Sequence, residues 1–148
     1  MKDKLAQDLK AAMLARDSFL VDTLKGLKAA ILNQEIASGK RESGLSDEEI
    51  ETLLAKESKK REEAAGLYEQ GGNVEMADKE RREKAVIQAY LPKQLSEEEI
   101  SQLVEEAIEQ TGASEAKDMG KVIGAVKAKA GNSAEGSLIA KIAKSKLQ

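Results

Sequence analysis

Lysine and carboxylate side chains are the groups that could do chemistry in this 148-residue chain, because it contains no Cys and no His. The missing residue types exclude a thiol or imidazole nucleophile, a Ser–His–Asp triad, a disulfide and the usual zinc sites. Two carboxylate clusters, 47–49 and 97–99, each follow a serine at a predicted helix start, where acids complement the helix dipole. We interpret both clusters as helix starts, and we expect no catalytic residue, no metal site and no cofactor.

The lysines are unevenly distributed, although the formal net charge of the whole chain is only −3. Residues 1–92 have a charge balance of −2 and residues 93–118 one of −6. Residues 119–148 hold six lysines and one acid, a balance of +5. A nearly neutral chain therefore contains a basic C-terminal segment directly after an acidic one.

Five of these lysines lie on or beside the polar faces of two predicted helices. At about 100° per residue, Lys121 points away from the apolar stripe of the first helix, and Lys127 and Lys129 flank that stripe. Lys141 and Lys144 lie opposite the apolar face of the second helix. Lysines placed in this way can bind the phosphates of a nucleic acid and release its counterions. They can also form an ordinary solvated face whose charges favour helix C-termini and pair with the acidic segment.

The surroundings of these lysines narrow the chemistry further. Neither aromatic residues nor arginines are interleaved with them, so we do not expect base stacking or bidentate base recognition. Any contact with a nucleic acid would involve its backbone and its shape. Gly39-Lys40 and Gly120-Lys121 both lack the upstream glycine and the following Ser or Thr of a P-loop.

Two glycines, Gly120 and Gly124, lie four residues apart on one side of a predicted helix. A glycine inside a helix costs about 1 kcal/mol relative to Ala, so this spacing suggests the close approach of another helix or of a ligand. Gly136 belongs to the same hypothesis and lies near the start of the last helix, which Ser133 is predicted to cap. Close helix packing and the approach of an anion to a helix N-terminus are the two interpretations.

Helical periodicity runs through the whole chain, and no period-two strand pattern interrupts it. About seven helical runs are separated by short turns. Ser46 with Glu49 forms a capping box that opens the third run. The third run and the fourth, 74–90, carry many charges and little apolar surface, and the turn 71–73 joins them. They are predicted to form a long charged helical hairpin within an all-α fold.

The single proline, Pro92, marks the predicted boundary between two domains, because proline disfavours helix at the residue before it. Directly after it, Ser96 with Glu99 forms a second capping box. We predict an N-terminal helical domain over residues 1–92 and a small three-helix domain over residues 93–148.

Two motifs resemble the signatures of the YqeY-like proteins. They are Ala89-Tyr90-Leu91-Pro92-Lys93-Gln94-Leu95-Ser96-Glu97-Glu98-Glu99 and Asp118-Met119-Gly120-Lys121-Val122-Ile123-Gly124. The run Thr23-Leu24-x-x-Leu27-x-x-Ala30-Ile31 and the tail from Gly131 to Leu147 fit the same family. The resemblance covers essentially the whole chain.

Residues 93–148 are also similar to the helical tail domain of the B subunit of the tRNA-dependent amidotransferase. That enzyme is a carbon–nitrogen ligase with glutamine as amido-N-donor, and it converts glutamyl- or aspartyl-tRNA to the glutaminyl or asparaginyl form. Its tail contacts the tRNA body, whereas amide transfer takes place in other domains. The resemblance therefore implies tRNA binding rather than catalysis for this segment. Gly136 stands where amidotransferase tails often have a proline.

We therefore expect a non-catalytic accessory protein whose C-terminal domain binds tRNA or a similarly structured RNA. The candidate RNA-binding residues are Lys121, Lys127, Lys129, Lys141 and Lys144. One alternative is an adaptor that presents its charged hairpin to a protein partner of the translation apparatus, and another is a helper that acts in trans with an amidotransferase. No run approaches the ~20 apolar residues of a membrane span, and the N-terminus lacks the apolar run of a signal peptide. We expect a cytoplasmic protein without a membrane partner.

Overall fold

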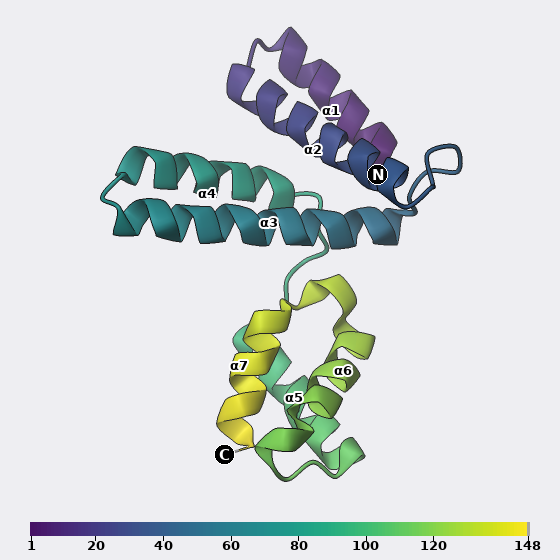
Figure 1. Ribbon diagram of the computed structural model, residues 1–148, viewed down its shortest axis with the longest axis vertical. Coiled ribbons are helices and arrows are strands. Elements are labelled where there is room, and N and C mark those ends of the chain that lie inside the picture. Colours follow the sequence, from purple (N-terminus) through teal and green to yellow (C-terminus); the bar gives the residue numbers. More distant parts are fainter. Residues whose placement is uncertain (148) are drawn as a thin grey trace. The chain divides into compact units, whose positions relative to one another are not determined.

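The computed structural model describes residues 1–147, and over that range the chain is all-α, as the sequence predicts (Figure 1). Seven α-helices follow one another in this range, and a short 3₁₀ helix lies on each side of the sixth. The bounds are α1 Lys2–Leu14, α2 Ser18–Ala37, α3 Asp47–Gln70, α4 Val74–Gln88, α5 Glu97–Thr111, η1 Ala116–Asp118, α6 Met119–Ala130, η2 Gly131–Ser133 and α7 Gly136–Lys146. None of these helices combines the length and the apolar composition needed to cross a lipid bilayer.

Among the described residues, polar side chains cap the N-termini of four helices, α2 to α5, and Asn73 caps α4 by accepting the Met76 N–H at 3.1 Å. The Ser46 hydroxyl accepts the Glu49 N–H at 3.1 Å, and the Glu49 carboxylate accepts the Ser46 N–H at 2.8 Å. Ser96 and Glu99 repeat this arrangement at the start of α5 with the same two distances. Both predicted capping boxes are confirmed. Asp17 caps α2 by accepting the Leu20 N–H at 3.1 Å.

The helices form two compact units, Met1–Leu91 and Pro92–Gln148, and each unit has its own cluster of buried apolar side chains. In the first unit, α1 and α2 form one hairpin, and α3 and α4 form a second, longer one (Figure 1). Its core draws on both hairpins and includes Leu5, Leu24 and Leu54.

The longer hairpin combines small side chains inside with ion pairs at its edges. Ser58, Ala65 and Ala77 are buried, so little apolar bulk separates α3 from α4. At the edges, Arg61 Nε lies 2.8 Å from a carboxylate oxygen of Glu83. The predicted charged hairpin is therefore present, and it packs with a thin interior.

Two aromatic contacts tie the α1–α2 hairpin to α4 and to the residues that follow it. The Tyr90 hydroxyl donates a hydrogen bond to the Asp8 carboxylate. The Arg82 guanidinium carbon lies 4.2 Å from the centre of the Phe19 ring. Burial, together with the Asp8 carboxylate, raises the pKa of Tyr90 above its usual value. These contacts identify the flank of the α1–α2 hairpin that faces α4.

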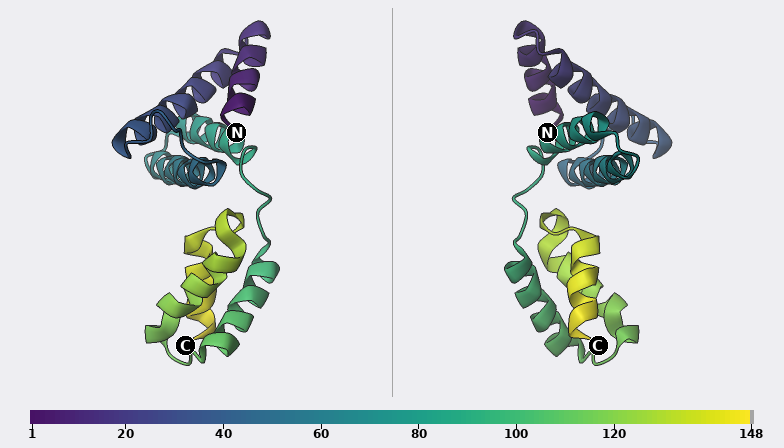
Figure 2. Two further views of the ribbon diagram at one scale, coloured as in Figure 1. Left: turned by 90° about the vertical axis from the view of Figure 1, so that its right-hand side faces the viewer. Right: turned by 90° about the vertical axis from the view of Figure 1, so that its left-hand side faces the viewer.

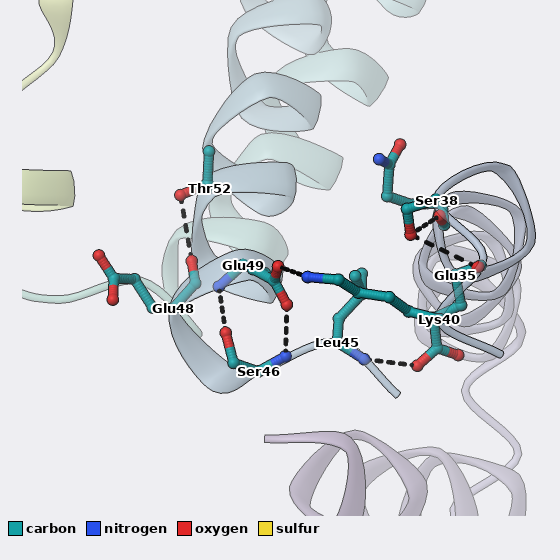
Figure 3. A network of polar contacts seen from close by, with 9 residues as sticks. Glu35, Ser38, Lys40, Leu45, Ser46, Glu48, Glu49 and Thr52 are labelled. Carbon is teal, nitrogen blue, oxygen red and sulfur yellow. Dashed lines mark hydrogen bonds and ion pairs between the residues drawn. The ribbon is translucent and has the colours of Figure 1, made fainter. Parts of the chain in front are cut away.

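A buried carboxylate anchors the loop between α2 and α3 (Figure 3). Glu35 is only 2% exposed, and its carboxylate accepts the Leu45 N–H at 2.9 Å. The same carboxylate binds the Lys2 ammonium at 2.8 Å. The Lys40 ammonium pairs with Glu49, which joins this loop to the capping box of α3. The network connects α1, α2 and α3 through polar contacts at one end of the unit.

Glu35 predicts a pH dependence of stability. Its hydrogen bonds to Lys2 and to the Leu45 N–H hold the pKa of its carboxyl below the ordinary value of 4.5. A lowered pKa in the folded state stabilises the fold above the unfolded-state value, and this contribution is lost as the pH falls through the folded pKa. We expect Glu35→Gln to lower the urea midpoint at pH 7 and to flatten its decline below about pH 4.5, measured by circular dichroism. A variant whose midpoint declines with acid as steeply as that of the unaltered chain would contradict this role.

In the second unit, α5, α6 and α7 surround one apolar core (Figure 2 shows the three helices from two sides). Its fully buried side chains include Val104 from α5, Val122 and Val126 from α6, and Ile139 from α7. The Leu95 N–H donates to the Ser133 carbonyl at 2.8 Å, which joins the chain before α5 to the turn before α7. This packing determines which faces of α6 and α7 point outward.

Candidate nucleic-acid interface

Lys121, Lys141 and Lys144 are exposed on the outward faces of α6 and α7. Val122 and Val126 bury one side of α6, and Ile139 and Ala143 bury one side of α7. At about 100° per residue, the three lysines lie away from these buried positions. The packing of two amphipathic helices therefore brings the lysines out into solvent.

These three ammonium groups form no ion pair with a carboxylate of residues 1–147. Asp118 lies near Lys121, but its carboxylate accepts the Ser114 N–H at 3.1 Å and the Glu115 N–H at 3.3 Å. Those two hydrogen bonds, with a smaller contribution from the charge of Lys121, hold the pKa of Asp118 below its usual value. Asp118 therefore stabilises the turn before α6 and leaves the Lys121 ammonium available.

The other two candidate lysines are engaged within the unit. Lys127 Nζ donates to the Ala134 carbonyl at 2.9 Å and to the Gly131 carbonyl at 3.4 Å, so this side chain binds the turn between α6 and α7. Lys129 pairs with Glu106 of α5 at 3.1 Å. The five predicted residues thus separate into three open ammonium groups and two that already have partners.

The acidic helix α5 takes up part of the basic charge, which was the alternative interpretation of the lysines. Glu106 pairs with Lys129, and Glu105 pairs with Lys146 of α7 at 2.7 Å. The sequence did not indicate a role for Lys146. It also did not identify Glu105 as the partner of Lys146 or Glu106 as the partner of Lys129. The sequence signal that could have predicted these pairs is the exposed acidic face of α5. The apolar residues of the same helix, Ile100, Val104 and Ala107, face the core.

Exposed ion pairs of this kind contribute about 0–1 kcal/mol each, so they hold Lys129 and Lys146 only weakly. An incoming polyanion could compete for both ammonium groups. In contrast, the hydrogen bonds of Lys127 hold backbone carbonyls at a helix end, and breaking them would leave these carbonyls without their donor. We therefore take Lys121, Lys141 and Lys144 as the main cations of this face.

The glycines of α6 do not mediate helix packing. A Cβ atom built on Gly120 or Gly124 would meet no heavy atom of the described residues within 4 Å, and both positions are exposed. The predicted close packing of two helices at these positions is therefore wrong, because the valine side of α6 faces the core instead. At Gly136, the nearest atom to such a Cβ is Lys127 Cε at 3.7 Å, an ordinary van der Waals distance. The approach of an anion to these glycines stays a prediction.

The open space at Gly124 predicts a stabilising substitution. Gly124→Ala places a methyl group where no neighbour obstructs it and replaces the poorest non-proline helix former with the best. We expect the free energy of unfolding to rise by about 0.5–1 kcal/mol, measured by urea denaturation. A destabilised variant would show that the position is more confined than the fold indicates. Gly26→Ala on α2 is the matched control, since its Cβ would also meet open space.

The described residues contain no group of three or more Asp, Glu, His or Cys side chains that could hold a metal ion. The acidic triplets that open α3 and α5 are used in part for capping, because Glu49 and Glu99 both bind the backbone N–H of their capping serine. The ammonium groups of the α6–α7 face are exposed to solvent, an arrangement that can bind phosphate groups.

The chain matches both a protein family and an individual relative. A sequence model of the family described as "Yqey-like protein" matches residues 2–147. The chain is also similar to "Altered inheritance of mitochondria protein 41, mitochondrial" of Eremothecium gossypii, with 36% identity over 87 residues. That match covers 59% of this chain and 46% of the relative, so it spans less than half of the relative's length.

Proposed function

Because the chain belongs to the YqeY-like family, we propose that it is an accessory protein whose C-terminal unit binds tRNA or a similarly structured RNA. The observation that carries the proposal is the outward face of α6 and α7, where Lys121, Lys141 and Lys144 are exposed and free of ion pairs within residues 1–147. The similarity of residues 93–148 to the amidotransferase tail supports tRNA as the class of partner.

The mode of binding follows from the side chains present. Lysines are point charges that bind phosphate oxygens, and they do not read base edges with the bidentate geometry of arginine. The α6–α7 face has no aromatic side chain on which a base could stack. The RNA is therefore bound through its backbone, and its folded shape selects it. The exposed Gly120 and Gly124 allow a phosphate backbone to approach α6 closely.

Salt dependence of tRNA binding tests this proposal. With three lysine–phosphate contacts, the affinity of the full chain for bulk tRNA is expected to fall about 30-fold between about 50 and 200 mM salt, measured by filter binding. Linear poly(U) of the same length is the control for shape, and it is expected to bind more weakly. Absence of tRNA binding at the lower salt concentration would overturn the proposal.

Amide transfer is not part of the proposed activity. The purified chain alone is expected to produce no amidation of mischarged tRNA, because its α6–α7 face offers ammonium groups without a nucleophile or an ammonia-delivering site. Clear turnover by the purified chain would replace the binding function with a catalytic one. Stimulation of a separate amidotransferase would instead assign the chain a helper role in trans.

One observation favours a second candidate function, a protein adaptor. The far end of the α3–α4 hairpin exposes Leu67 to 68% and Val74 to 62%, which is unusual for a hairpin otherwise covered by charges. Affinity capture with and without nuclease separates the two functions. Partners that are lost after nuclease treatment support RNA binding, whereas partners that persist and require Leu67 and Val74 support the adaptor.

A further inference from the structure

The α1–α2 hairpin has a groove on the flank that turns away from α4. Lys2 and Leu5 of α1 and Lys28, Ala29 and Leu32 of α2 line a cavity of about 300 Å³ there. Asp8 of α1, which Tyr90 contacts, and Phe19 of α2, which Arg82 of α4 contacts, do not line this groove. The first unit therefore buries one flank of the hairpin and leaves the other open.

The open flank carries large apolar side chains. Leu32 is 43% exposed and Ile36 is 54% exposed, and with Lys28 they form an i, i+4, i+8 stripe along α2. Met13, near the other end of α1, is 51% exposed. Burial of exposed leucine and isoleucine side chains favours association, so an exposed stripe of this kind beside a groove is typical of an interaction surface.

The electrostatic character of the groove is positive. Among the described residues, Glu35 is the only carboxylate that lines it; Glu35 is 2% exposed and already binds Lys2 and the Leu45 N–H. Lys25 and Lys28 are exposed on the same flank of α2, and neither forms an ion pair within residues 1–147. The groove thus offers an apolar floor with unneutralised cations at its rim.

We propose that this groove binds an acidic amphipathic helix of a partner protein. Two helices packed side by side leave a concave seam, and the side-chain ridge of a third helix fits such a seam. Apolar residues of the partner, spaced at i, i+4 and i+7, pack against Leu32 and Ile36. Its flanking carboxylates pair with Lys25 and Lys28. A bilayer surface would instead favour a continuous convex apolar face.

Two designed 18-residue helical peptides test this proposal on the full chain. Both carry leucine at positions i, i+4 and i+7, and their polar faces carry glutamate in one and lysine in the other. Fluorescence anisotropy is expected to show saturable binding of the acidic peptide, at least tenfold tighter than that of the basic peptide. No saturable binding of the acidic peptide, or equal binding of both, would overturn the proposal.

Variants locate the binding site. Leu32→Ser with Ile36→Ser is expected to weaken acidic-peptide binding at least tenfold, and so is Lys25→Glu with Lys28→Glu. The matched control, Leu67→Ser with Val74→Ser, removes two exposed apolar side chains from the α3–α4 hairpin and should leave the affinity within twofold. Equal weakening by the control would overturn the groove as the site. Far-UV circular dichroism confirms that each variant is folded, as expected for substitutions at exposed positions.

The remaining measurements distinguish other occupants of the groove. Binding to phosphatidylcholine–phosphatidylglycerol vesicles that requires Leu32 and Ile36, without peptide binding, would assign the surface to a membrane and overturn the proposal. A dimer that requires the same two residues, detected by light scattering, would overturn it in favour of a second copy. The tRNA affinity of Leu32→Ser with Ile36→Ser is expected to be unchanged, so failure here is distinguishable from failure of RNA binding.

Discussion

Charge reversal of Lys121, Lys141 and Lys144 to glutamate is expected to lower the affinity for tRNA about 100-fold at low salt. Each lysine that contacts a phosphate releases a counterion, so losing three contacts should also reduce the slope of log affinity against log salt by about 3. The three side chains are exposed and carry no ion pair within residues 1–147, so the fold should tolerate their replacement. Filter binding over a range of salt concentrations measures both effects.

A matched set of lysines on the first unit separates a local site from a general charge effect. Lys10, Lys59 and Lys79 are also exposed, and the same reversal there changes the net charge by the same amount. We expect that triple variant to lose less than fivefold in affinity. If both sets weakened binding equally, the α6–α7 face would not be the RNA-binding surface. Lys129→Glu alone should lower the affinity for tRNA less, because Lys129 already pairs with Glu106.

Ile139→Ala is expected to destabilise the C-terminal unit by about 2–5 kcal/mol. Ile139 of α7 is fully buried in the core that α7 shares with α5 and α6. Its truncation leaves a cavity that a small three-helix core cannot easily refill. A loss of this size is a large fraction of the total stability of a small domain. Because α7 positions Lys141 and Lys144, RNA affinity should fall as the unit unfolds. Urea denaturation and filter binding on the same preparation measure the two losses.

Two controls accompany this substitution. Ile123→Ala removes a similar number of atoms from a partly buried position on α6 and is expected to cost less stability. Leu54→Ala makes a comparable cavity in the core of the first unit, and its folded fraction should keep its tRNA affinity. Full stability of Ile139→Ala would contradict the packing of α7 described above. Loss of RNA affinity in folded Leu54→Ala would assign part of the RNA-binding surface to the first unit.

Local signals in the sequence predicted the helices well, because those signals act over a few residues. Ser46 and Ser96 each precede a glutamate by three positions, and both form the expected capping boxes. Asp17 likewise caps α2 locally by accepting the Leu20 N–H. Ser133 is the exception: it ends η2, and α7 begins at Gly136. The Leu95 N–H donates to the Ser133 carbonyl, so a contact between residues 38 positions apart in the sequence shapes that turn.

Contacts between residues far apart in the sequence determine which side chains have partners, and local sequence patterns could not predict these contacts. Lys127 and Lys141 are both lysines of the basic segment. Of these two, it is Lys127 that donates hydrogen bonds to backbone carbonyls in the turn between α6 and α7. Lys129 lies within reach of Glu106 only because α5 packs beside α6. The open flank of α2 could not be predicted for the same reason, since it is the packing of the first unit that leaves Leu32 and Ile36 exposed.

The sequence by itself determined the all-α fold, the family, and the concentration of positive charge in the last 30 residues, because helical periodicity, capping residues and charge counts are properties of neighbouring positions. Only the tertiary structure decided which lysines are open, that Gly120 and Gly124 face solvent, and that one flank of the α1–α2 hairpin is uncovered. Those outcomes depend on which helix packs against which. That choice follows from the burial of whole helix faces, and residues far apart in the chain contribute to it.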